Sequence, residues 1–175
     1  GIEALFVLIS FQLLDQSGLA TASNSLIVMT LGATAGFLCW NFAGKVFMGD
    51  VGSIFLGALL GIYLIGSFYD SGVMFWSFLI LAGAFFADST YTLLVRLFSG
   101  QRITEAHRNH AYQILSRKWQ SHARVVAALT LVNLCWLLPM AWLAKDNPPY
   151  APALALLAYL PLLMFCYRLG AGRQS

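Results

Sequence analysis

Long runs without a charged residue constrain the fold of this chain more than any other feature. They cover residues 16–44, 51–69, 71–87, 125–144 and 147–167, and a further apolar stretch covers residues 4–14. Most of them approach the ~20 residues that a helix needs to span a bilayer. Backbone amides find no partner in lipid, so the runs should be helices, and they lack the alternation of barrel strands. The sequence predicts an all-α, polytopic membrane protein.

Composition supports the membrane class. Of the 175 residues, 59% are hydrophobic and 10% are charged, and the mean hydropathy is +0.75, far from the averages of soluble domains. The expected partner is the lipid bilayer and not nucleic acid. The three cysteines lie in apolar runs and are interpreted as small buried hydrophobes. Because no linker or internal repeat divides the chain, residues 1–175 are expected to form a single membrane-embedded domain.

The distribution of Lys and Arg predicts how the chain is oriented. If residues 41–50, residues 96–124 and the C-terminus share one side, that side holds every Lys and Arg except Lys145. The positive-inside rule makes this side cytoplasmic. The predicted path has about six transmembrane helices, of which the third covers 53–69 and the fourth 73–95. A basic cytoplasmic loop follows the fourth helix.

The stretch NFAGKVFMGDVGS, residues 41–53, puts two charges at the mouth of an apolar run. In a structural interpretation, Lys45 snorkels to the surface and Asp50 or Ser53 caps the next helix. In a functional one, Gly49 and Gly52 allow a tight turn in which Asp50 holds a divalent cation. Lys45 and the helix start would then bind phosphate oxygens. One carboxylate alone makes a poor Mg²⁺ site, so other acids would have to contribute.

Asp88 is a second anomaly, because it lies inside the fourth predicted span. Arg96 follows about two helical turns later, which puts Asp88 in the cytoplasmic half of the bilayer. An acid there costs ~2.5–3.5 kcal/mol on insertion scales and is a functional candidate by default. A pair with a base from a neighbouring helix is the structural alternative.

The loop GQRITEAHRNHAYQILSRKWQ, residues 100–120, is the third feature. Apolar positions recur at helical spacing between residues 104 and 119, which predicts a short amphipathic helix at the membrane surface. His107 and His110, three apart, would share a face and could bind a metal, relay a proton or donate to phosphate. Arg102 and Arg108 add cationic donors, so we interpret the cluster as anion-binding; a solvated face is the alternative.

Three features occur in a fixed order: FMGDVGS between two spans, an Asp in the next span, and then EAHRNHAYQ. Together they resemble the polyprenyl-phosphate N-acetylhexosamine-1-phosphate transferases of glycosyltransferase family 4. That family includes the phospho-MurNAc-pentapeptide transferase, and the H-R-x-H-A-Y-Q form is similar to its O-antigen-initiating subgroup. The resemblance covers roughly residues 30–124. It implies the C-terminal half of a longer enzyme of the bacterial plasma membrane, with a cytoplasmic active site. The family's acidic pair lies on an earlier loop, so this chain alone should be inactive.

The resemblance also implies a reaction and a set of site residues. The family moves N-acetylhexosamine-1-phosphate from a UDP-sugar to undecaprenyl phosphate with Mg²⁺ and releases UMP, as the first membrane step of surface polysaccharide synthesis. A homodimer is compatible with this. The implied catalytic residues are Asp50, which would also bind the metal, Asp88, His107 and His110. The implied substrate-binding residues are Asn41, Lys45, Phe47, Gly49, Gly52, Ser53, Arg102 and Arg108.

An ion-coupled transporter or channel subunit is the alternative function. It would put Asp88 on an ion path and predicts further acids inside the spans, but the second, third, fifth and sixth predicted spans carry none between their ends. A purely structural scaffold is a third option, and it leaves the Gly-Asp-Val-Gly-Ser corner unexplained.

Overall fold

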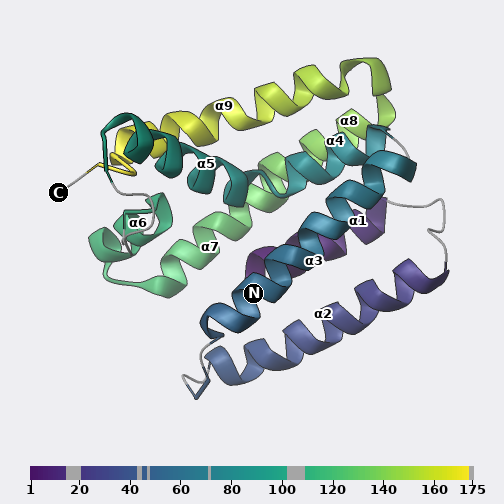
Figure 1. The fold of residues 1–175 in the computed structure, drawn as a ribbon, viewed down its shortest axis with the longest axis horizontal. Coiled ribbons are helices and arrows are strands. Elements are labelled where there is room, and N and C mark those ends of the chain that lie inside the picture. The colour runs from purple at the N-terminus through teal and green to yellow at the C-terminus, as the bar shows by residue number, and fades with distance from the viewer. Residues whose placement is uncertain (15–20, 43–44, 47, 71, 102–108, 174–175) are drawn as a thin grey trace.

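The computed structural model describes residues 1–14, 21–42, 45–46, 48–70, 72–101 and 109–173, and at residues 21–24, 42, 50 and 70 it describes the backbone only. The described residues form helices and connecting turns (Figure 1). In chain order the longer helices are α1 (Ile2–Leu14), α2 (Thr21–Phe42), α3 (Gly49–Asp70), α4 (Gly72–Leu81), α5 (Gly83–Phe98), α6 (Ala111–Trp119), α7 (His122–Val132), α8 (Leu138–Asp146) and α9 (Ala151–Leu169). A π-helical turn, Asn133–Leu137, joins α7 to α8, and a 3₁₀ turn, Pro148–Tyr150, precedes α9.

Three helical stretches are long and apolar enough to cross a membrane: Val51–Tyr69, His122–Asp146 and Pro148–Leu169. A fourth arises if α4 and α5 are counted as one broken span. The all-helical prediction is therefore confirmed for the described residues, and the three or four candidate spans are consistent with a polytopic membrane protein. The apolar helices Ile2–Leu14 and Ser25–Asn41 are shorter, so the predicted number of six stays a prediction.

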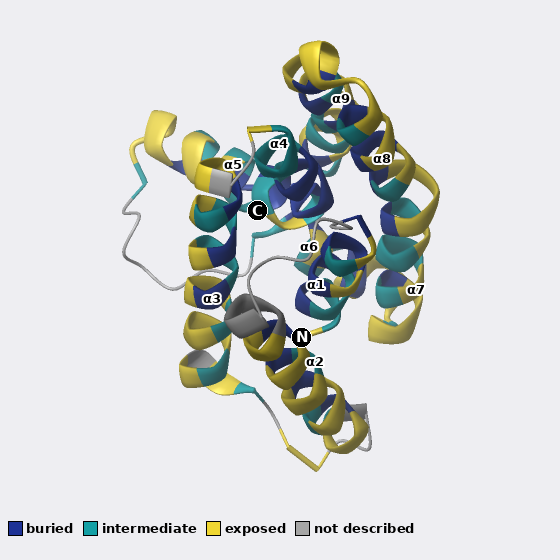
Figure 2. Ribbon diagram, turned by 90° about the vertical axis from the view of Figure 1, so that its right-hand side faces the viewer, coloured by how far each residue is buried: buried dark blue, intermediate teal, exposed yellow. Residues whose placement is uncertain are grey.

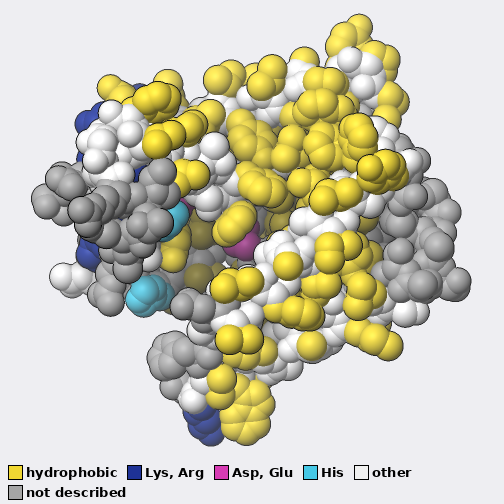
Figure 3. Space-filling model, viewed as in Figure 1, with side chains coloured by type: hydrophobic (Ala, Val, Ile, Leu, Met, Phe, Trp, Pro, Cys, Tyr) yellow, Lys and Arg dark blue, Asp and Glu magenta, His cyan; other side chains and the backbone are white. Residues whose placement is uncertain are grey.

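The helix ends gather at two opposite ends of the molecule. The end of α2, the start of α3, the end of α5, all of α6 and the end of α9 lie at the left of Figure 1. The start of α2, the end of α3 and the turn between α8 and α9 lie at the right. The elements that the predicted path assigns to the cytoplasmic side thus share one end. Lys and Arg side chains visible in Figure 3 also lie toward that left end, beside a largely hydrophobic face.

The core lies where α1, α4, α8 and α9 face one another (Figure 2). Phe11 of α1 and Phe78 of α4 make an edge-to-face contact with ring centroids 5.0 Å apart. Ser77 of α4 donates a hydrogen bond of 3.1 Å to the carbonyl of Ala141 in α8. Large apolar side chains on the outer faces, such as Leu156, stay exposed, as a lipid-facing surface requires.

The prediction of one continuous span over residues 73–95 is wrong in shape, because α4 and α5 meet at an angle of 73° around Ala82. Two contacts with α9 hold the bend. The hydroxyl of Tyr159 donates a hydrogen bond of 2.8 Å to the Leu79 carbonyl, one turn before the break. Gly83 opens α5 where a Cβ would meet Leu137, Leu162 and Tyr159 at 3.4–3.5 Å. Tertiary contact, with no proline present, fixes this bend.

A polar pair that the sequence analysis missed joins α1 to the π-helical turn. The amide nitrogen of Asn133, which is 1% exposed, donates a hydrogen bond of 2.9 Å to Glu3 Oε2. The π-helical turn widens the helix at this position and marks the site of a polar contact between apolar helices.

Replacement of Gly83 tests how the bend is packed. Gly83→Leu should lower the free energy of unfolding by about 1–3 kcal/mol, because a branched side chain cannot fit between Leu137, Leu162 and Tyr159. Gly83→Ala is the matched control and should be tolerated, because a lone Cβ makes only ordinary contacts there. The measurement is the thermal unfolding midpoint of the purified protein in detergent. Equal midpoints for the two variants would contradict the packing at the bend.

Candidate functional site

Asp88 lies in the middle of α5 and is 9% exposed. Its carboxylate accepts a hydrogen bond of 2.8 Å from the backbone N–H of Ala111 and a longer one of 3.4 Å from that of Tyr112. Thr92, one turn along α5, donates its hydroxyl to Asp88 Oδ1 at 3.1 Å. The first two donors are the opening amides of α6, which have no partner within their own helix. Asp88 therefore caps α6 from a different helix.

His110 stands immediately before α6, with extended backbone angles of φ −68° and ψ 148°. Its Nδ1 lies 3.5 Å from Asp88 Oδ1, and its backbone N–H donates to the side-chain oxygen of Gln113 at 3.3 Å. The imidazole also stacks on the Tyr112 ring, with centroids 6.0 Å apart. The expectation that a helix carries His110 is thus wrong, because capping bonds at Ala111 and Gln113 start the helix one residue later. His107 lies outside the described residues.

The predicted amphipathic helix is present as α6, although it begins at Ala111. Its apolar residues Ala111 and Leu115 are buried, and its last turn carries Arg117 and Lys118. Ala111 packs beside Cys166 near the end of α9, so this cysteine is one of the buried hydrophobes expected from sequence. Cys39 and Cys135, by contrast, are exposed. The helix packs against α7, α9 and α5 at the left end of Figure 1.

The corner between α2 and α3 contains the other predicted group. Asn41 donates its side-chain amide to the Val46 carbonyl at 2.8 Å, and so closes the turn that carries Lys45. The Lys45 ammonium lies 5.3 Å from the centroid of the Trp40 ring, and its own backbone N–H donates to the Trp40 carbonyl. These contacts keep Lys45 at the surface beside an aromatic ring.

Gly49 and Gly52 stand on either side of Asp50, and the structure restricts a side chain at both positions. Gly49 has φ +60°, in the left-handed region that other residues seldom adopt. A Cβ on Gly52 would lie 2.6 Å from Cγ of Met48, so a larger residue would displace that side chain. Because α3 begins at Gly49, Asp50 stands in its first turn and Ser53 one turn further on, where the helix dipole favours negative charge.

The structure brings together some of the predicted residues and not others. Asp88 and His110 face each other. Asn41, Lys45, Gly49, Gly52 and Ser53 share the corner at the start of α3, with the backbone of Asp50. The calls on Phe47, Arg102, His107 and Arg108 lie outside the described residues, as does the side chain of Asp50. Within the described part of the chain, no three Asp, Glu, His or Cys residues gather as metal ligands would.

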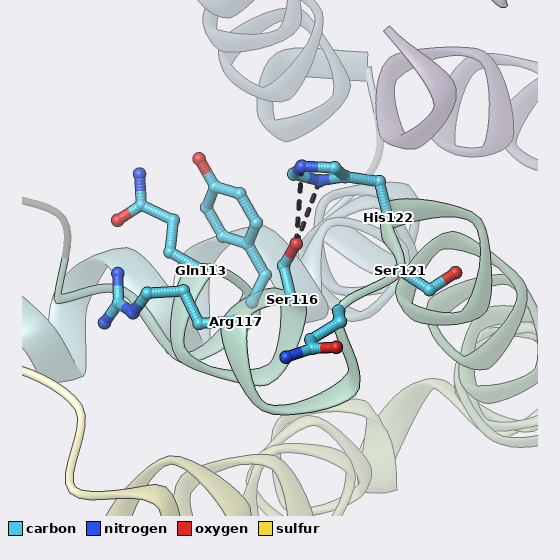
Figure 4. A pocket seen from close by; sticks show the side chains of 7 residues that line it. Gln113, Ser116, Arg117, Ser121 and His122 are labelled. Carbon is cyan, nitrogen blue, oxygen red and sulfur yellow. Dashed lines mark hydrogen bonds between the residues drawn. The ribbon is translucent and has the colours of Figure 1, made fainter.

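A cavity of about 580 Å³ opens between α6 and α7 (Figure 4). It is lined by Tyr112, Gln113, Ser116, Arg117, Gln120, Ser121 and His122. The Ser116 hydroxyl and His122 Nδ1 are hydrogen-bonded at 3.0 Å across it. No role was predicted for His122 from the sequence. Ser116 and His122 lie on different helices, so no periodic pattern in the sequence pairs them.

Comparison with known proteins relates part of the chain to a family. Residues 1–68, which include the FMGDVGS corner, match the family described as glycosyl transferase family 4. This segment therefore matches the family that the sequence resemblance predicted. The chain is also similar to a protein of Bacillus subtilis (strain 168) named "Probable undecaprenyl-phosphate N-acetylglucosaminyl 1-phosphate transferase". The two are 32% identical over 112 residues, which are 62% of this chain and 31% of that protein. No solved structure matches the chain.

Removal of the Asp88 carboxylate tests its capping role. Asp88→Ala should raise the hydrogen-exchange rate of the Ala111 and Tyr112 amides by about 2- to 30-fold, because a lost cap costs about 0.5–2 kcal/mol. Thr92→Val is the control, since it removes a donor to Asp88 and leaves the cap in place. Exchange would be followed by mass spectrometry on the purified full-length protein. Unchanged rates at the start of α6 in Asp88→Ala would refute the cap.

Proposed function

We propose that this chain is part of a bacterial plasma-membrane enzyme that transfers N-acetylhexosamine-1-phosphate from a UDP-sugar to undecaprenyl phosphate. The observation that carries the proposal is the family match over residues 1–68, which contains the Gly49–Ser53 corner. The name of the Bacillus subtilis relative describes a transfer of this kind. Since the chain spans 31% of that relative, the complete site would include residues that this chain does not contain. The product would begin O-antigen or a related cell-surface glycan.

The reaction is a phosphoryl transfer with two anionic partners. An oxygen of the lipid phosphate bonds to the sugar-bearing phosphorus of the UDP-sugar, and the bond from that phosphorus to UMP breaks. The lipid phosphate is already ionised, so the nucleophile needs little help from a base. The protein must place two anions in line and offset their charge.

The proposed roles rest on the family resemblance and, for the described residues, also on where they lie. Lys45 and the first amides of α3 would bind phosphate oxygens at the corner, with Asn41 holding the turn closed. Arg102, Arg108, His107 and His110 would bind oxygens of the nucleotide sugar. Phe47 would contact the substrate, while Gly49, Gly52 and Ser53 would shape and supply the backbone of the corner. Asp88 would act through His110 and α6, whose positions it sets.

Mg²⁺ is the proposed cofactor, with Asp50 as one ligand. A carboxylate is the type of donor that Mg²⁺ prefers, and the first turn of α3 can carry it. The described residues supply no further cluster of ligands, so the rest of the coordination would come from the substrate, water and acids elsewhere in the protein. When bound, the ion would neutralise charge on the diphosphate.

Replacement of Asp50 tests the metal assignment. In the full reading frame that encodes this chain, Asp50→Asn should lower sugar-phosphate transfer by at least about 100-fold, because the neutral amide is a weaker Mg²⁺ ligand. Transfer of label from UDP-N-acetylglucosamine and other UDP-amino sugars to undecaprenyl phosphate would be measured over a range of Mg²⁺ concentrations and with chelator. Asp70→Asn, at the opposite end of α3, is the matched control and should stay near the parent rate. Near-normal transfer by Asp50→Asn would remove Asp50 from the metal site.

Replacement of His107 tests the anion-binding assignment. His107→Ala should lower transfer by about 100-fold, since it removes a donor to developing negative charge, and leave the amount of membrane-inserted protein unchanged. His122→Ala is the control among the remaining histidines, because His122 contacts Ser116 and lies outside the proposed anion-binding set. If His107→Ala were degraded or poorly inserted, a structural role would explain its loss better.

A further inference from the structure

We propose that the C-terminal turn, Ala171–Arg173, is a positioning element of the site: it holds Gln101 and Asn109 against α5 and so fixes where His110 stands. The importance of this position for turnover rests on the function proposed above. The hold itself rests on contacts among described residues. No residue of the turn was singled out by the sequence analysis, because it follows the last apolar run and carries no catalytic motif.

Backbone groups of Gly172 connect two distant parts of the chain. The Gly172 carbonyl accepts a hydrogen bond of 3.1 Å from the side chain of Gln101, just after α5. The Gly172 N–H donates a hydrogen bond of 2.9 Å to the carbonyl of Asn109, just before α6. The Asn109 side chain donates in turn to the Arg173 carbonyl at 3.1 Å. One short turn thereby binds residues on both sides of the 102–108 segment.

The turn packs directly against α5. A Cβ on Gly172 would lie 2.8 Å from the Thr92 carbonyl oxygen and 3.0 Å from the Val95 Cβ, and its φ is +77°. Only glycine satisfies both the space and the backbone angle. Ala171, beside it, is fully buried and packs near Ala111 of α6. The turn therefore has a fixed place between α5 and α6, with no room to shift toward α5.

Two independent sets of hydrogen bonds hold the residues immediately before and after His110. On one side, Asn109 is held by Gly172 and Arg173; on the other, Ala111 is held by Asp88. Gln101 extends the same network, because its side-chain oxygen accepts a hydrogen bond of 3.3 Å from Nε of Arg96, a guanidinium only 3% exposed. Release of the turn would remove the restraint on Asn109, and His110 would then be positioned from the α6 side alone, by Asp88 and Gln113.

The decisive variant is Gly172→Ala in the full reading frame. The added methyl group must move the turn away from Thr92, which shifts Asn109 and with it His110. We expect transfer to fall by about 10- to 100-fold, the loss that a displacement near 1 Å can cause. We also expect faster hydrogen exchange at the amides of residues 109–112, with the rates in α4 and α8 unchanged. Gly170→Ala is the matched control for backbone strain, because Gly170 has φ +72° but its Cβ would meet only Arg173 Cδ, at 3.8 Å.

A double-variant cycle separates positioning from general loss of structure. If the turn acts through His110, then His110→Ala and His110→Ala/Gly172→Ala should transfer sugar phosphate at the same rate. If the transfer rate of the double variant falls by the product of the two single-variant fold-reductions, the proposal is overturned. So would parental exchange rates at residues 109–112 in Gly172→Ala. If Gly172→Ala does not accumulate, Asn109→Ala removes the bond to Arg173 alone and should show the same two effects at smaller size.

The exchange measurement keeps the two proposals apart. If the parent protein transfers no sugar phosphate from any UDP-sugar, the proposed function fails, and exchange at residues 109–112 still decides whether the turn holds Asn109. If the parent is active and Gly172→Ala keeps the parental transfer rate, the positioning role fails while the proposed function stands.

Discussion

The capping of α6 by Asp88 is the contact on which the arrangement at the left end of Figure 1 depends. A buried carboxylate is costly unless donors replace the water it has lost. The opening amides of α6 supply those donors, together with Thr92, and the same amides would otherwise lack partners. A nine-residue helix is marginal by itself, so the cap and the burial of Ala111 stabilise what local propensity cannot. The α6 amides replace the water that the Asp88 carboxylate loses on burial, and the carboxylate gives those amides the partners that they would otherwise lack.

The bend at Ala82 makes this contact geometrically available. Before the bend, α4 packs on α8 and α1; after it, α5 turns by 73° and runs along α9. Because α9 runs beside α5, the turn that follows α9 lies next to Thr92 of α5. In that position, Gly172 forms hydrogen bonds with Gln101 and Asn109. A straight helix over the same residues would carry Asp88 away from α9. The hydrogen bond from Tyr159 to Leu79 thus contributes indirectly to the site.

Local patterns predicted the helices, their apolar faces and the glycine requirement of the corner at Asp50, because each depends on residues close in sequence. They failed where distant residues decide. No proline marks the bend in the sequence, and the bend depends on the packing of Gly83 against α9. The bond between Glu3 and Asn133 joins residues 130 positions apart. The start of α6 was misplaced because Asp88, 23 residues earlier, sets it.

The two aspartates singled out by sequence have different surroundings, and this separates their tasks in the proposed reaction. Oδ1 of Asp88 already accepts hydrogen bonds from Ala111 and Thr92 and faces His110, so a metal ion or phosphate would have to displace protein donors to reach it. Asp50 follows a glycine with positive φ at the open start of a helix, where the backbone amides can face an anion. Asp88 is therefore best understood as a positioning residue that orients His110. In the proposed reaction, the corner at Asp50 would make the direct contacts with the ion and the diphosphate.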